Sequence, residues 1–128
     1  MPLLRRRADP ARERLRAGFR ATVTHVDAAQ RALIAAVPMS RDPGVPLAQA
    51  IEDMSRHLDA ATTALESWHD IEQVHEWTKC RAAILEARAG LETLDPEEEM
   101  GFEALNARIG EVIAPLDIFA DVSAALRR

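Results

Sequence analysis

The residue types best suited to chemistry are two glutamate–histidine pairs in the middle of the chain. Glu66 precedes His69 by three residues, and Glu72 precedes His75 by the same interval. Residues three apart share one face of a helix, and a carboxylate beside an imidazole is a suitable ligand pair for a transition metal. Glu66, His69, Glu72 and His75 are therefore the candidate metal ligands in this sequence.

The Glu-x-x-His spacing resembles the motif of ferritin-like di-iron proteins, although the likeness covers only about ten residues. Those proteins carry the two motifs on separate facing helices and add an inward glutamate from each of two further helices. Here both pairs flank one expected turn, and the outer helices offer no carboxylate on their apolar faces. We therefore expect a solvated, charged turn at residues 66–75 and no cofactor, with a metal or small-ligand site there as the alternative.

Other enzyme motifs are missing from the sequence. It contains no glycine-rich phosphate loop, no nucleophile elbow and no zinc-ligand spacing. Cys80 is the only cysteine, and its apolar surroundings predict a small buried side chain rather than a nucleophile. We favour a non-catalytic role, and because a single cysteine suits a reducing compartment, we expect a cytoplasmic location.

Composition predicts one globular domain. The 128 residues are 48% hydrophobic and only 4% aromatic, which allows one mainly aliphatic core. The whole chain carries a net charge of −5, but seven arginines and two acidic residues give residues 1–20 a net charge of +5. We assign residues 1–8 to a basic extension, expected to be flexible, and residues 9–128 to the domain.

The basic start suggests neither nucleic acid nor membrane as a partner. Aromatic residues do not alternate with these arginines and the overall pI is near 5.4, so we do not expect nucleic-acid binding. No apolar segment follows the arginines as a secretory signal requires. No apolar run reaches the roughly 18 residues of a membrane span.

Apolar periodicity and helix-ending residues predict four helices. Asp9-Pro10 and Asp95-Pro96 each place an N-cap aspartate before a proline at the first helical position. Pro115 falls inside the last helix and should kink it. The predicted helices cover residues 10–37, 46–68, 71–93 and about 96–126.

The second helix carries an apolar stripe that changes sides after Trp68. The stripe has the spacing of a helix–helix seam and consists of Leu47, Ile51, Met54, Leu58, Ala61, Leu65 and Trp68. Continuing the same helix would place Glu72 and His75 on the seam, and a turn at residues 68–71 removes that conflict. We predict an all-α fold, an antiparallel up-down-up-down four-helix bundle. The alternative is one long central helix in a swapped dimer.

The third helix has a wide apolar arc, about 220° at about 100° per residue. One buried stripe needs only about 100°, so the excess predicts a second contact surface. Trp77, Arg81, Ile84 and Arg88 lie on this arc, and arginine and tryptophan are enriched at interfaces. We predict a homodimer, or docking onto a partner protein, through these four residues. The alternative is that the arginines lie along the edge of the bundle.

Overall fold

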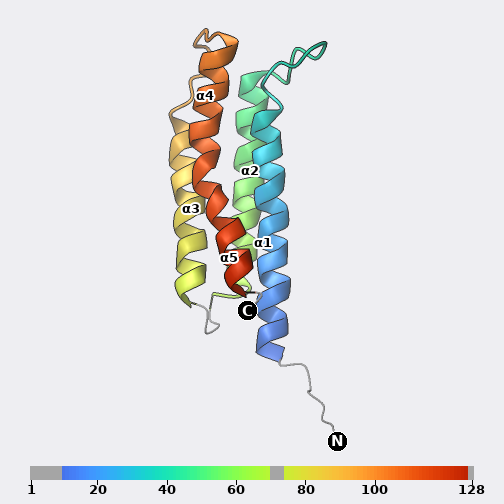
Figure 1. Cartoon of the computed structure of the whole chain (residues 1–128), viewed down its shortest axis with the longest axis vertical. Helices are drawn as coiled ribbons and strands as arrows, with labels where there is room; N and C mark the ends of the chain where they lie inside the picture. The colour runs from blue at the N-terminus through green and yellow to red at the C-terminus, as the bar shows by residue number, and fades with distance from the viewer. Residues whose placement is uncertain (1–9, 70–73, 127–128) are drawn as a thin grey trace, which may run out of the picture.

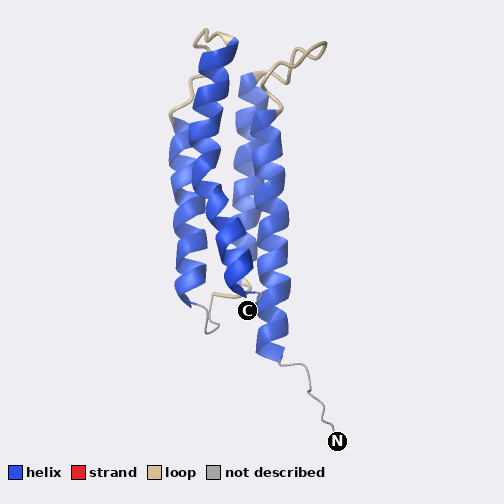
Figure 2. Cartoon of the chain, viewed as in Figure 1, coloured by secondary structure: helices blue, strands red, loops and turns tan. Residues whose placement is uncertain are grey.

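The computed structural model describes residues 10–69 and 74–126, and it is all-helical. Figure 2 shows helices joined by loops, with no strand in the described ranges. The predicted all-α class is therefore confirmed. The elements are α1 (Pro10–Ile34), α2 (Leu47–Glu66), α3 (Val74–Glu92), α4 (Phe102–Ile113), the 3₁₀ helix η1 (Ala114–Asp117) and α5 (Ile118–Leu126).

The helices lie side by side with their long axes close to parallel (Figure 1). α1 packs along α2, and α3 packs against α2 on one side and against α4, η1 and α5 on the other. The start of α1, the end of α2 and the end of α5 lie together, at what we call the α5 end. Residues 35–46 and 93–101 lie at the opposite end, which we call the loop end.

Two prolines act as the sequence predicts. Pro10 is the first residue of α1, where its missing N–H has no intrahelical partner to lose. Pro115 lies in η1, the 3₁₀ turn between α4 and α5, because its ring prevents a regular α-helical hydrogen bond. The last helical segment is therefore divided into α4 and α5.

The predicted start of the fourth helix at Asp95-Pro96 is wrong, because α4 begins at Phe102. Asp95 Oδ1 accepts a hydrogen bond from the Glu97 N–H at 2.9 Å, and the Asp95 carbonyl accepts one from the Glu98 N–H at 3.1 Å. These bonds form a local turn. An N-cap aspartate and a turn aspartate bond the same nearby N–H groups, so the sequence pattern fits both.

α2 ends close to the predicted position. The Ser67 and Trp68 N–H groups each donate to a carbonyl three residues back at 3.1 Å, which tightens the last turn. Within the described residues α2 and α3 are thus two helices. The predicted turn at residues 68–71 extends beyond the described residues at 70 and 71, and the predicted extension at residues 1–8 lies wholly outside them.

The core lies along the contacts between the helices and is mainly aliphatic. It includes five residues of the predicted α2 stripe, Met54, Leu58, Ala61, Leu65 and Trp68. No helix in the described parts of the chain is long and apolar enough to cross a membrane.

Trp68 is the largest fully buried side chain, and it lies directly against Gly18 of α1. Its Nε1–H donates to Thr22 Oγ1 at 3.2 Å, and the Thr22 hydroxyl donates to the Gly18 carbonyl at 2.8 Å. A Cβ atom on Gly18 would lie 2.6 Å from Trp68 Cδ1 and 2.6 Å from Ser67 Oγ. Only glycine leaves room for the indole at this position.

This contact predicts opposite effects for two glycine-to-alanine changes. Alanine normally stabilises a helix interior over glycine by about 0.5–1 kcal/mol. Gly110→Ala, where nothing lies within 4 Å of the new Cβ, should show that gain. Gly18→Ala should instead lower the free energy of unfolding by about 1–3 kcal/mol through overpacking. Urea denaturation measures both, and a stabilising Gly18→Ala would contradict the Trp68 placement.

Candidate functional site

The glutamate–histidine pairs are only partly described. His69 Nδ1 lies 2.8 Å from the Glu66 carbonyl oxygen and 3.9 Å from its carboxylate. Both side chains are more than half exposed, and His75 is exposed at the start of α3. Glu72 lies outside the described residues, which contain no group of three or more potential ligands placed to hold a metal ion. The metal or small-ligand alternative at this turn stays a prediction.

The four predicted interface residues of α3 do not form one exposed surface. Ile84 is only 1% exposed and belongs to the core, so its predicted contact with a second subunit is corrected to an internal one. Trp77 is half-buried, and its Nε1–H donates to the Leu65 carbonyl at 2.9 Å. Arg88 pairs with Asp59 of α2, and Arg81 alone among the four is exposed.

The wide apolar arc of α3 has an internal explanation. α3 has neighbours on two sides, α2 and the α4–η1–α5 segment, and each neighbour covers part of the arc. Cys80, Ile84 and Leu91 are buried between them. Among the large apolar side chains of α3 whose burial the structure describes, Leu85 is the exposed one, at 47%. Two neighbouring helices bury a wider apolar arc than the single stripe of one helix–helix contact.

Cys80 is buried, as predicted. Removal from solvent, with a smaller contribution from the nearby Glu76 carboxylate, raises the pKa of the Cys80 thiol to about 12. Since the thiolate is the nucleophilic form, almost none is available at neutral pH. Cys80 acts as a small hydrophobic core residue.

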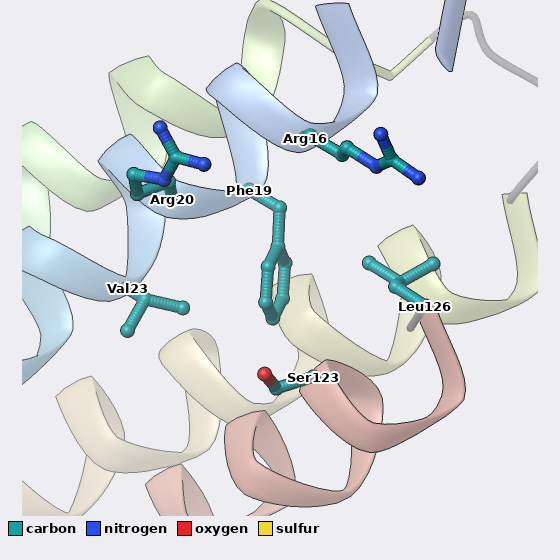
Figure 3. A pocket seen from close by; sticks show the side chains of 6 residues that line it. All are labelled: Arg16, Phe19, Arg20, Val23, Ser123 and Leu126. Carbon is teal, nitrogen blue, oxygen red and sulfur yellow. The ribbon is translucent and has the colours of Figure 1, made fainter. Parts of the chain in front are cut away.

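The structure contains a pocket that the sequence analysis did not identify. It lies between α1 and α5 at the α5 end and has a volume of about 410 Å³ (Figure 3). We call it the α1–α5 pocket. Its lining consists of Arg16, Phe19, Arg20, Val23, Ser123 and Leu126.

α1 supplies both the charge and much of the apolar surface of the pocket. Arg16 and Arg20 are exposed and lie on the two sides of the Phe19 ring in Figure 3. Neither guanidinium has an ion-pair or hydrogen-bond partner among the described residues. Val23 on α1 and Leu126 on α5 add apolar surface.

Phe19 is fixed by two aromatic neighbours. Its ring meets that of Trp68 edge-on, with centroids 5.8 Å apart, and stacks on that of Phe119 at 6.2 Å. Such aromatic pairs stabilise a fold by more than the burial of their apolar area alone. Phe19 thus joins the α1–α2 contact to α5 and holds the inner wall of the pocket in place.

The lining residues are suited to binding rather than to reaction chemistry. Two guanidinium groups can bind a carboxylate through paired hydrogen bonds, and the aliphatic and aromatic side chains between them can cover an apolar group. The lining holds no carboxylate, imidazole or thiol for acid–base or thiolate chemistry. The arrangement matches an anionic group that carries an apolar group beside it.

One signal in the sequence could have identified this pocket. Arg16 and Arg20 are four residues apart, and so are Phe19 and Val23, which places a basic stripe beside an apolar stripe on α1. The C-terminal side of the pocket depends on where Leu126 meets α1, which the sequence pattern does not give. Comparison with protein-family models, with curated proteins and with solved structures found no significant match to this chain.

Ile84 is buried and its neighbour Leu85 is exposed, so the same substitution at the two positions tests the core assignment. Ile84→Asp should place an unpaired charge in the core and lower the free energy of unfolding by at least about 3 kcal/mol. Leu85→Asp, one residue along on the surface, should change it by less than about 1 kcal/mol. Circular dichroism during urea denaturation measures both. An Ile84→Asp chain with unchanged helicity and stability would contradict the core assignment.

Proposed function

We propose that this protein is a non-catalytic, self-associating helical module whose docking site is the α1–α5 pocket. The observation that carries the proposal is the pairing of Arg16 and Arg20, unpartnered among the described residues, with the apolar surface between them. Arginines beside an aromatic side chain are typical of protein-binding surfaces. The alternative is that a different protein docks at the same pocket. Measurement of self-association by the purified chain distinguishes the two.

Charge distribution favours a second copy as the binding partner. Residues 1–20 carry +5, so the remaining 108 residues carry −10, and each molecule contains both a basic segment and its acidic complement. Complementary charges increase the rate of encounter and fix the register of docking more than they add affinity. Apolar contact within the pocket must then supply most of the affinity, and the charge contacts supply the salt-sensitive remainder.

The same proposal includes an antiparallel up-down-up-down bundle and a cytoplasmic location. The bundle is supported by the side-by-side arrangement of α1, α2, α3 and α4 in Figure 1. The location is supported by the single cysteine, which is free and buried. A homodimer through α3 would now have to rest on Arg81 and Leu85, because Ile84 is buried and Arg88 pairs with Asp59.

Sedimentation over a range of protein concentrations tests self-association. One chain has a mass of 14.1 kDa, and we expect the average mass to rise above this value between micromolar and millimolar protein. The rise should weaken as salt increases from about 0.1 M to about 1 M, because the screening length falls from about 10 Å to about 3 Å. A mass of 14.1 kDa at every concentration would exclude self-association.

A further inference from the structure

A second surface, at the loop end, has the properties that the α1–α5 pocket would bind. Residues 95–102 cover most of the connection between α3 and α4 and the first residue of α4, and they read Asp-Pro-Glu-Glu-Glu-Met-Gly-Phe. Glu97, Glu98 and Glu99 are all exposed, and the described residues give their carboxylates no ion-pair partner. We call residues 95–102 the acidic loop.

Phe102 ends the acidic loop with an exposed aromatic ring. It is 55% exposed, whereas the other phenylalanines and tryptophans among the described residues are buried or half-buried. Phe102 is the first residue of α4, and Gly101 before it has nothing within 4 Å of its Cβ position. A single exposed apolar residue is ordinary on a protein surface. Its place three residues after the last of three consecutive glutamates makes this one specific.

The acidic loop and the α1–α5 pocket are complementary in charge and in chemistry. The pocket has apolar side chains between two arginines, and the loop has a phenylalanine beside three carboxylates. Arg16 and Arg20 can each bind a carboxylate through paired hydrogen bonds. The Phe102 ring can then lie among Val23 and the other apolar lining residues, which removes apolar surface of both partners from water.

The two surfaces of one molecule cannot meet each other. They lie at opposite ends of the long axis in Figure 1. α1 alone has 25 residues, a length of about 37 Å at about 1.5 Å per residue. Contact between pocket and loop must therefore join two molecules.

We propose that the acidic loop of one copy, with Phe102 as its apolar anchor, docks into the α1–α5 pocket of a second copy. This inference rests on the proposed self-association and names its two surfaces. The contact is head-to-tail, so each added molecule leaves one free pocket and one free loop. Such heterologous contacts produce open chains unless their rotation closes a ring, whereas a contact through α3 would pair identical surfaces in a dimer.

Two full-length variants test this arrangement because each blocks one surface. The pocket variant carries Arg16→Glu and Arg20→Glu, and the loop variant carries Glu98→Gln and Phe102→Ser. All four positions are exposed, so both variants should keep wild-type helicity by circular dichroism. Each alone should associate at least about tenfold more weakly than the wild type, the loss expected when a contact worth about 1.4 kcal/mol or more is removed.

Mixing the two variants provides the decisive step. The pocket variant still has an intact loop and the loop variant still has an intact pocket. Sedimentation of the equimolar mixture should therefore show one new species of about twice 14.1 kDa, with no larger assembly, because neither free end can extend. A mixture that stays monomeric, or that forms assemblies as long as those of the wild type, would overturn the inference.

A charge-matched control separates local docking from net charge. Arg31→Glu with Arg41→Glu makes the same charge change as the pocket variant at exposed positions of α1 and the α1–α2 connection. This control should associate at least as strongly as the wild type, and a loss equal to that of the pocket variant would overturn the inference. A wild-type protein that never associates would instead defeat the proposed function. A wild type that associates while both blocked variants still do so defeats the head-to-tail contact alone.

Discussion

The close contact between Trp68 and Gly18 ties the end of α2 to α1 and positions the residues around it. Trp68 follows the last turn of α2, and its indole occupies the space that a side chain at position 18 of α1 would fill. Because the indole is wholly buried, its N–H needs a partner, and Thr22 supplies one. Thr22 in turn donates to the Gly18 carbonyl, so every polar group in this contact is used. The contact fixes the end of α2 against α1.

The same contact determines the α1–α5 pocket. The Trp68 ring packs edge-on against Phe19, and Phe19 stacks on Phe119, so one row of rings connects α2, α1 and α5. Phe19 forms the inner wall of the pocket, and the helical spacing then places Arg16 and Arg20 beside it on the outer side of α1. A stability contact in the core thus positions the charged residues of the proposed docking site. Trp77 strengthens this end by its hydrogen bond to Leu65.

Much of the fold could be predicted from the sequence, whereas the site could not. The α2 stripe, the start of α1 at Pro10 and the break caused by Pro115 depend on local spacing and local backbone chemistry, which the sequence contains. The start of α4 was misplaced because Asp95 satisfies a turn as readily as an N-cap. Ile84 was assigned to a surface because burial by two neighbouring helices depends on their packing, which periodicity alone does not give. Prediction of the pocket would have required knowing that α5 lies beside α1.

Intermolecular paramagnetic broadening can show whether the acidic loop of one molecule lies in the α1–α5 pocket of another. A spin label on Ala104→Cys, in a chain that also carries Cys80→Ala, would sit on the exposed first turn of α4 beside Phe102. That chain would be mixed with wild-type protein that carries no spin label and is enriched in ¹⁵N. Docking of the acidic loop into the pocket should selectively broaden the backbone amide signals around Arg16, Val23 and Leu126. Broadening centred on Arg81 and Leu85 of α3, with the pocket signals unchanged, would contradict it.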